Sequence, residues 1–438
     1  MNIVSQKGGI NNDAISIFKI NFGGLISFKW IAKHFGYIHN KQFQDKMIKG
    51  PFKKWIHTHS FVSQGSDLCI IEDKIEYAPK FDKIRSKIIQ KRIQNYLNQL
   101  FLYRSRILIN DIDLEKRILE KNKGKKILIT GSHGLIGSAL IPVLTTIGRH
   151  SITRLVRSKQ DKYFTSTNGH GNILFWDPKH KKLNHRELEG FDIIIHLAGE
   201  NIFGRWTETK KNKILDSRVE STKLLSESLT KLSNPPSLLI CASAIGYYGN
   251  RPNEALTEES GPGKGFLSEV CQKWENATND AAEIGIRVVN TRFGIVLTPK
   301  GGILQKLLGS FKFGLGITIG NGSKNQDQFI SWISIEDVIK SIFYSITNPS
   351  IQGAINIVSP TPVTNLEFSN TIKKILNPKL SISINPKITK LIFGQMSDEL
   401  LSTNTYVIPK KLVSSGYKFF NPELEDALRF LLGKIELK

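Results

Sequence analysis

The chain has 438 residues, and its 61 Lys and Arg residues outnumber 38 Asp and Glu residues, so the formal net charge is +23. This length exceeds what one hydrophobic core supports and predicts two or three domains. The basic residues are spread along the chain and form no single stripe, which argues against nucleic-acid binding. The longest apolar runs, such as "DIIIHLAG", are too short to span a membrane.

The cysteines and the N-terminus indicate the compartment. Cys69, Cys241 and Cys271 are odd in number and widely separated, which is typical of reduced thiols and not of a disulfide framework or a metal cluster. The first residues lack the apolar region of a signal peptide. We therefore expect a cytoplasmic protein.

The first quarter of the chain predicts a strand-rich domain. Residues 20–78 alternate short apolar runs with turn signals and predict strands. Apolar residues at helical spacing over residues 81–109 predict a long helix. Residues 114–125 are charged and end at a glycine, so we interpret them as a linker that closes a domain of residues 1–113.

Two histidines of this region raise the question of a metal. In "WIHTH", Trp55, His57 and His59 share one face of a strand by period two. Two histidines on one face can bind a metal, but the spacing reveals no third ligand. A cavity wall or cross-strand packing is the favoured interpretation, and we predict no metal site.

From residue 126 the pattern changes to strands that alternate with helices. The strands are "KILIT", "ITRLVR", "ILFWD", "DIIIHLA", "SLLICASA" and "RVVNTRFGIVL", and helices are expected near 135–148, 207–232 and 266–284. Buried strands that alternate with helices predict an α/β fold with a Rossmann-type, doubly wound parallel sheet. A smaller C-terminal lobe is expected beyond it.

A glycine-rich turn follows the first of these strands. "GSHGLIG" places Gly131, Gly134 and Gly137 between a strand and a helix. The first glycine permits a tight turn, the second lets backbone approach a pyrophosphate, and the third lets the helix pack close to the strand. The free N–H groups of the helix N-terminus attract the phosphates. This context predicts dinucleotide binding.

The end of the second strand indicates which dinucleotide binds. An NAD site carries Asp or Glu there, to bond the ribose 2′-hydroxyl. This strand reads "SITRLVRSK" and ends at Arg157, with no acidic residue before Asp161. Arg157 can pair with a 2′-phosphate, so NADP (NADPH) is predicted over NAD. A solvated arginine at the strand end is the alternative.

Several motifs in order carry a family resemblance. They are "ILITGSHGLIG", "HLAGENI", "RWT", "CASAIGYYG", "RFGIVL", "FISWISIEDV", "GAINIVSPTPVTN", "IPKKL" and "GYKF". Over residues 126–432 the chain resembles the atypical extended short-chain dehydrogenase/reductases of the epimerase-like kind. The resemblance implies a cofactor domain at 126–350, followed by a lobe at 351–438 that contains a small domain of unknown function near 383–432.

The resemblance also implies which residues hold the cofactor. Asp177 of "FWDP" is expected near the adenine. The remaining expected contacts are Ser132, His133, Leu135 and Ile136 of the glycine turn, and Leu197, Ala198, Gly199 and Glu200 on the nicotinamide side.

The chemistry expected of this superfamily uses a Ser and a Tyr-x-x-x-Lys helix motif. Ser243 of "CASAIGYYG" matches the serine, which positions the substrate oxygen. On the helix "GFLSEVCQKWE", Leu267 stands where the Tyr is expected and Cys271 where the Lys is expected. The nearest phenols are Tyr247 and Tyr248, and we take both as candidate proton donors, with a slight preference for Tyr247.

Three further side chains of this helix have possible roles. Glu269 and Lys273 are titratable neighbours, and Cys271 is interpreted as a buried small residue.

In "GENIFGRWT", Asn201, Arg205 and Trp206 follow the fourth strand at the edge where such sheets bind ligands. They are candidate substrate contacts, because an arginine beside a tryptophan suits an anionic or flat molecule. Bracing of the next helix is an equal alternative.

The first 113 residues resemble another family. "WIAKHFGYIHNKQFQDKMIKGPFKKWIHTHSF", "DKIEY" and "LFLYRSRIL" are similar to helix-grip domains of the START/polyketide-cyclase (SRPBCC) type, which have an α+β fold with a ligand cavity. The residues before Trp30 are expected to provide too few strands, so this domain is expected to be incomplete.

The sequence therefore predicts an NADP-dependent oxidoreductase or epimerase-like enzyme acting on an unknown small molecule. The alternative is a non-catalytic, NADP-gated ligand-binding or regulatory protein. We expect neither nucleic acid nor membrane as a partner, and the sequence does not indicate an oligomeric state.

Overall fold

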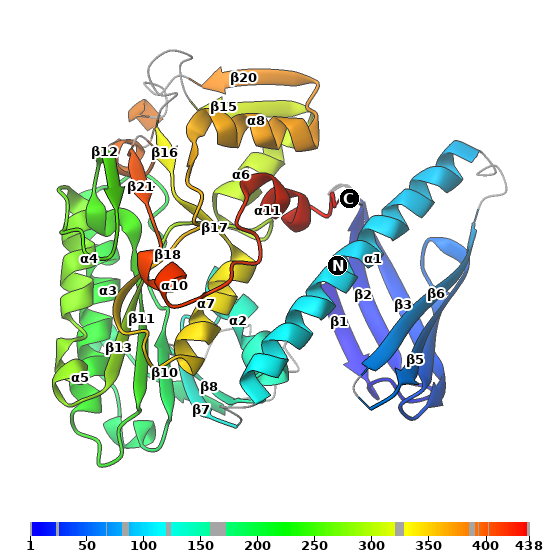
Figure 1. Ribbon diagram of the computed structural model, residues 1–438, viewed down its shortest axis with the longest axis horizontal. Helices are drawn as coiled ribbons and strands as arrows, with labels where there is room; N and C mark the ends of the chain where they lie inside the picture. The colour runs from blue at the N-terminus through cyan, green and yellow to red at the C-terminus, as the bar shows by residue number, and fades with distance from the viewer. Residues whose placement is uncertain are drawn as a thin grey trace. The chain divides into compact units, whose positions relative to one another are not determined.

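The computed structural model of the protein describes residues 2–22, 26–66, 68–80, 87–119, 124–157, 172–319, 328–384, 390–392, 394–401 and 403–435. These residues form two compact units, which we call the N-terminal unit, up to Asn98, and the C-terminal unit, from Gln99 onward (Figure 1).

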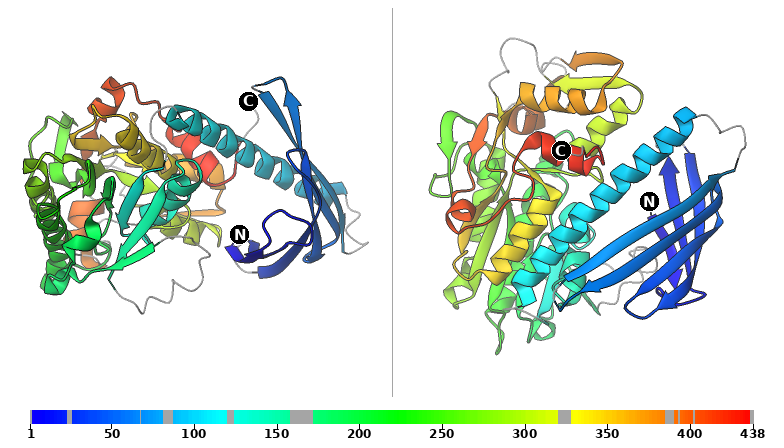
Figure 2. Two further views of the ribbon diagram at one scale, coloured as in Figure 1. Left: turned by 90° about the horizontal axis from the view of Figure 1, so that it is seen from below. Right: turned by 45° about the vertical axis from the view of Figure 1, so that its right-hand side comes forward.

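The N-terminal unit is an antiparallel sheet of six strands in sequential order, each paired with the next along the chain. Figure 2 shows the twist of its long strands. The strands are β1 (Asn2–Lys7), β2 (Ile15–Phe22), β3 (Ile26–Ile38), β4 (Gln42–Lys49), β5 (Phe52–Gln64) and β6 (Leu68–Pro79).

The start of the chain contributes more strands than the sequence predicted. β1 and β2 lie before Trp30, where too few strands were expected. Tight turns with left-handed backbone at Gly8, Gly9 and Asp13 connect the two strands. These turns interrupt the alternation of apolar and polar residues by which a strand is recognised in the sequence. The helix α1 (Lys87–Leu119) follows the sheet and is longer than predicted, because residues 114–119, which we had assigned to a linker, continue it.

The C-terminal unit contains the predicted parallel sheet, with seven strands in the order β18-β13-β11-β10-β7-β8-β9. All neighbours in this sheet are parallel. The fold class is therefore confirmed, and the strand order reverses between β7 and β10, where such sheets bind ligands. The strands are β7 (Lys126–Thr130), β8 (Ser151–Val156), β9 (Asn172–Phe175), β10 (Ile193–His196), β11 (Leu238–Ala244), β13 (Arg287–Phe293) and β18 (Gly353–Ile357).

The two faces of this sheet carry different helices. Along β7, Ile127 and Ile129 pack with α2 and α7 on one face, whereas Leu128 packs with α3 and α5 on the other. This alternation by period two buries both faces, which explains why the strands are apolar throughout. The helices, visible in Figure 1, are α2 (Leu135–Thr146), α3 (Glu208–Leu229), α4 (Phe266–Asn276), α5 (Asn279–Glu283) and α7 (Ile335–Thr347).

The rest of the C-terminal unit consists of short strand pairs and helices. β12 (Arg251–Leu256) pairs with β21 (Thr405–Val407), β14 (Ile295–Leu297) with β17 (Trp332–Ser334), β15 (Leu315–Ile319) with β20 (Leu380–Ile384), and β16 (Phe329–Ile330) with β19 (Val363–Thr364). The helices are α6 (Gly302–Phe311), α8 (Asn365–Leu376), α10 (Lys410–Ser414) and α11 (Leu424–Leu431). Within the described parts of the chain, no helix combines the length and the apolar character that a membrane span requires.

Candidate active site

The glycine turn joins β7 to α2 with the geometry that a dinucleotide requires. Gly131 has φ +65°, which favours glycine, and a Cβ there would lie 2.6 Å from the backbone of Leu197. A Cβ on Gly137 would lie 2.4 Å from the carbonyl oxygen of Gly131, so only glycine lets α2 approach the strand this closely. Gly134 precedes the helix as its N-cap. The N-terminus of α2 thus presents backbone N–H groups to an anion.

The other residues of the turn differ in exposure. Ser132 is buried, His133 is exposed, and Leu135 and Ile136 are half-buried. The exposed side of the turn is therefore formed by His133 and the backbone of Gly134.

Thr130, at the end of β7, ties the glycine turn to the loop that follows β10. Its Oγ1 accepts the backbone N–H groups of Leu197 and Ala198 at 3.1 and 3.2 Å, and lies 2.7 Å from Nδ1 of His196. Because Thr130 already accepts two bonds, its hydroxyl proton is directed to His196. Complete burial lowers the pKa of His196 to about 4, so the imidazole is neutral and can accept. The sequence did not indicate either residue, since a Thr and a His inside strands look like ordinary core positions.

Two charged residues lie at the carboxyl edge of the sheet on either side of the glycine turn. Arg157 is exposed directly after β8. Glu200 forms an ion pair with Lys210 at 2.7 Å, and this hydrogen bond is the main reason why the pKa of Glu200 is lowered. The charges of Lys213 and Arg157 lower it further. The backbone of Gly199 leaves room for Arg218, whose guanidinium a Cβ would meet at 3.3 Å.

The side chain of Asp177, expected near the adenine, is engaged locally. It accepts from the ring of His180 at 2.6 Å and caps the short turn Pro178–His180. The hydrogen bond to His180 lowers the pKa of Asp177.

The three candidate substrate contacts after β10 differ in their surroundings. Asn201 and Arg205 are exposed, and Asn201 accepts the backbone N–H of Phe203 at 2.9 Å. Trp206 is buried, donates its indole N–H to the carbonyl of Ile202 at 2.7 Å, and packs in an apolar cluster with Ile214, Val270 and Met396. This placement favours the alternative in which Trp206 braces the following helix.

Ser243 lies at the end of β11 and is part of a buried polar network. Its hydroxyl donates to Oε1 of Glu275 at 2.6 Å, and Arg292 on β13 donates to both oxygens of the same carboxylate at 2.8 Å. Side chains of Arg292 and Glu275 are only 4% and 12% exposed. Burial alone would lower the pKa of Arg292, but hydrogen bonds with Glu275 outweigh it and raise the pKa. The two bonds from Arg292 therefore fix the carboxylate of Glu275 in the position where it accepts from Ser243.

The two candidate tyrosines occupy opposite environments on the turn that follows β11. Tyr248 is fully buried, donates to Asn356 at 2.7 Å and accepts from Arg292 at 2.9 Å. Burial raises the pKa of Tyr248 to about 12. Tyr247 is half-buried, and the guanidinium carbon of Arg292 lies 3.4 Å from its ring centroid. Of the two phenols, Tyr247 is the one that solvent or a substrate reaches.

The positions that replace Tyr-x-x-x-Lys lie against this turn. A Cβ on Gly246 would contact Leu267 at 3.1 Å and the Sγ of Cys271 at 3.8 Å. Cys271 is buried, and burial raises the pKa of its thiol to about 12, so it stays protonated and unreactive. The polar group that α4 does bring to Ser243 is Glu275, one turn beyond Cys271. The Trp-Glu pair at the end of this helix served to align it with the Tyr-x-x-x-Lys motif. The sequence spacing does not show that Glu275 faces the serine.

The C-terminal unit also has a hollow of about 750 Å³ along α1 and α7. None of its lining residues belongs to the glycine turn or to the network around Ser243. The lining residues are Arg106, Ile109, Asn110, Asp113, Leu114, Lys340, Phe343, Tyr344, Thr347, Asn348, Pro349, Tyr417, Lys418, Phe419 and Phe420.

The parallel sheet and its glycine turn have the architecture of a dinucleotide-binding fold. The sequence profile of the NAD dependent epimerase/dehydratase family matches residues 127–357, and that of a domain of unknown function (DUF1731) matches residues 387–431. The chain belongs to the NAD dependent epimerase/dehydratase family. This confirms the resemblance of the C-terminal unit, including its small terminal domain.

Relatives with the same family name cover this unit. An epimerase family protein of Mycobacterium bovis is 34% identical over 305 residues, which are 69% of this chain and 96% of the relative. The epimerase family protein YfhF of Bacillus subtilis is 34% identical over 309 residues, or 70% of this chain and 97% of the relative.

Two solved structures extend the comparison. The nucleoside-diphosphate sugar epimerase of Corynebacterium glutamicum is 30% identical with a TM-score of 0.76, and the match covers 99% of this chain and 83% of that one. The human epimerase family protein SDR39U1 (isoform 2) with NADPH is 30% identical with a TM-score of 0.61, covering 71% of this chain and 100% of that one. The first match includes the N-terminal unit, whose resemblance to the SRPBCC type stays a prediction.

Proposed function

We propose that the protein is an NADP-dependent oxidoreductase or epimerase acting on a small molecule that binds beside Ser243. The observation that carries this proposal is the placement of two features at one edge of the sheet. The glycine turn follows β7, Ser243 ends β11, and only β10 lies between these two strands. In a parallel sheet all carboxyl ends lie at the same edge, so the cofactor and the serine face one site.

The choice of NADP rests on Arg157. The end of β8 offers this exposed arginine where an NAD site has a carboxylate, and a guanidinium pairs well with a phosphate. The human relative whose structure contains NADPH supports the same choice. A charge-assisted contact worth about 1.5–3 kcal/mol gives NADPH an advantage of roughly 10- to 100-fold.

The substrate we propose is a nucleoside-diphosphate sugar or a similar anionic carbonyl or hydroxyl compound. Asn201 and Arg205 are exposed on the loop after β10, and an exposed arginine can bind a diphosphate. The name of the Corynebacterium glutamicum relative supports this class. Trp206 is not included, because its indole is already packed and hydrogen-bonded.

Because the chain lacks the Tyr-x-x-x-Lys motif, another group must transfer the proton of the substrate hydroxyl. NADP, when bound, supplies the acceptor or donor of the hydride. Ser243 directs its proton to Glu275, so its lone pairs are left to accept the hydroxyl of a substrate. A substrate proton can pass to Ser243 as the serine proton passes to Glu275. The half-buried Tyr247 is the second candidate, whereas the buried Tyr248 serves the network around Arg292.

A second candidate function is an NADP-gated binding protein that performs no reaction. It is favoured by Leu267 and by the inert thiol of Cys271, which occupy the positions of the usual tyrosine and lysine.

The two functions are separated by incubating the protein with NADP or NADPH and a panel of nucleoside-diphosphate sugars. Absorbance follows nicotinamide oxidation or reduction, and NMR spectroscopy detects an epimerised sugar that leaves the cofactor unchanged overall. Turnover that Ser243→Ala removes supports the enzyme. Tight cofactor binding with no product across the panel would support the binding protein instead.

A further inference from the structure

The strands β4, β5 and β6 of the N-terminal unit bring a cluster of four polar side chains to one face of the sheet. Asp45 lies directly opposite His57 in the pairing of β4 with β5, and Asp73 lies opposite His59 in the pairing of β5 with β6. Since His57 and His59 are two residues apart on one strand, all four side chains share a face. The sequence did not predict this cluster, because the two carboxylates lie on the strands that flank β5 and only the register of the sheet brings them next to the histidines.

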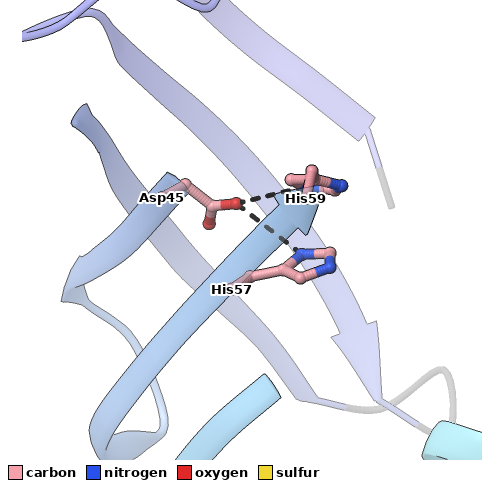
Figure 3. A group of neighbouring side chains, drawn as sticks. All are labelled: Asp45, His57 and His59. Atoms are coloured by element: carbon pink, nitrogen blue, oxygen red, sulfur yellow. Dashed lines mark ion pairs between the residues drawn. The ribbon is translucent and has the colours of Figure 1, made fainter. Parts of the chain in front are cut away.

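Each imidazole of the cluster has one ring nitrogen near each carboxylate. Nε2 of His57 and Nδ1 of His59 lie 3.0 and 2.6 Å from Oδ1 of Asp73. Nδ1 of His57 and Nε2 of His59 each lie 3.7 Å from Oδ2 of Asp45. Figure 3 shows these two histidines and Asp45 pointing toward one another from the two strands.

The contacts with Asp73 indicate which nitrogens carry protons, because Nε2 of His57 is hydrogen-bonded to this carboxylate and Nδ1 of His59 lies 2.6 Å from the same oxygen. A carboxylate only accepts, so in neutral imidazoles the N–H groups lie at Nε2 of His57 and Nδ1 of His59. The lone pairs are then on Nδ1 of His57 and Nε2 of His59, and both are directed to the side of Asp45. These two nitrogens and the carboxylate of Asp45 therefore direct their electron pairs to one place, and a cation bound there would stabilise the arrangement.

We propose that Asp45, His57 and His59 form a binding site for a divalent transition-metal ion of the zinc class. Two imidazoles and one carboxylate are a ligand set that such ions prefer. The three donor atoms lie within 4.8 Å of one another. Donors on a tetrahedral zinc ion, with bonds of about 2.0–2.1 Å, are roughly 3.3–3.4 Å apart, so small side-chain rotations close the site.

In this site Asp73 is a positioning residue. Metal-bound histidines usually donate their other N–H to a carboxylate, which fixes the ring and strengthens the donor. Asp73 accepts such a bond from His57 and lies 2.6 Å from Nδ1 of His59, so it is placed to orient both rings. The ring of Phe43 stacks on His59 with 4.2 Å between centroids, which also restricts its rotation. Three protein ligands leave a fourth position for water or for an anionic ligand.

The site is tested by zinc titration of the full-length protein after treatment with a chelator. We use a Cys69→Ser background, because the exposed thiol of Cys69 could bind zinc by itself. Competition with a chromophoric chelator gives the affinity, and Co²⁺ gives a visible spectrum that distinguishes nitrogen and oxygen ligands from thiolates. Far-UV circular dichroism confirms that each variant is folded.

One zinc ion per chain is expected, with a Co²⁺ spectrum free of thiolate bands. Asp73→Asn, which keeps all three ligands, should weaken zinc binding about 10- to 100-fold. Asp45→Asn and His59→Gln should weaken it further, and the control His39→Gln, at an exposed position in the turn between β3 and β4, should not. Absence of stoichiometric zinc, or zinc binding that Asp45→Asn and Asp73→Asn leave unchanged, would overturn the proposal and reduce the cluster to hydrogen-bonded packing.

Discussion

The hydroxyl of Ser243 donates a hydrogen bond of 2.6 Å to Glu275, and Arg292 holds the same carboxylate through two bonds of 2.8 Å. The serine of the proposed active site is thus fixed by an ion pair from a neighbouring helix and strand. Leu267 and Cys271 stand where a tyrosine and a lysine are usual, and the polar group that α4 brings to the serine is Glu275.

The first prediction concerns this ion pair. Glu275→Gln leaves the buried guanidinium of Arg292 without its counter-charge, and removal of one partner of a buried pair costs about 3–5 kcal/mol. The free energy of unfolding, measured in urea, should fall by that amount. The matched control is Glu269→Gln, an exposed position on the same helix, which should change it little. Similar losses in both variants would mean that the pair does not stabilise the fold.

The second prediction separates the two tyrosines. Tyr247→Phe should lower turnover by about 10²–10⁴ if this phenol transfers the proton. Tyr248→Phe should leave turnover per folded molecule nearly unchanged, but should lower the free energy of unfolding by about 1–3 kcal/mol because Asn356 loses its donor. Rate measurements and urea unfolding of both variants make the comparison. Full turnover in Tyr247→Phe would assign the proton to Ser243 and Glu275.

The sequence predicted the parallel sheet and the glycine turn because both depend on local signals. Apolar runs mark buried strands, and the spacing of Gly131, Gly134 and Gly137 reflects contacts within one turn. Glu275 and Asp45 could not be predicted in the same way. The first depends on which face α4 turns toward β11, and the second on the register of two strands. The orientation of a helix and the register of two strands are tertiary relationships, and the spacing of residues in one sequence does not reveal them.

The N-terminal unit illustrates the same limit at the level of whole elements. β1 and β2 are short and are separated by tight turns, so the sequence did not indicate them, and the pairing of β1 with β2 and of β2 with β3 stabilises them instead. The charged residues near the end of α1 indicated a linker, although they continue the helix to Leu119.

The third prediction concerns pH. Burial, then the charges of Asp111 and Asp337, raise the pKa of Glu336 from 4.5 to about 7, while Lys300 and Lys340 oppose the shift. An acid with a raised pKa binds its proton more tightly in the folded state, so stability is lost as pH rises from about 4.5 to about 7.

Glu336→Gln removes the ionisable carboxyl and with it the loss of stability as pH rises. The melting temperature of the variant should exceed that of the parent at about pH 8, where the parent carboxyl is ionised, and the difference should vanish at about pH 4. Calorimetry across this range provides the measurement. A difference that does not depend on pH would show that Glu336 ionises without penalty.

The fourth prediction concerns where the chain can be cut. The linker seen in the sequence suggests a cut at Lys123, but the second half of α1 packs within the C-terminal unit. Tyr103 contacts Phe430 with 4.9 Å between ring centroids, and Leu114 packs against the main core. A protein that begins at Gln99 should therefore fold and bind NADPH, whereas one that begins at Lys123 should melt at a lower temperature. Equal melting temperatures would show that these contacts do not stabilise the unit.

The most direct test of the account is a fluorescence titration of the protein with NADPH and with NADH. We expect NADPH to bind roughly 10- to 100-fold more tightly, because Arg157 pairs with the 2′-phosphate. Arg157→Asp should erase or invert this order, and Gly137→Val should abolish the binding of both, since its side chain would meet the backbone of the glycine turn. Equal affinities in the parent protein would remove Arg157 from the site, and binding that survives Gly137→Val would contradict the assignment of the cofactor to this turn.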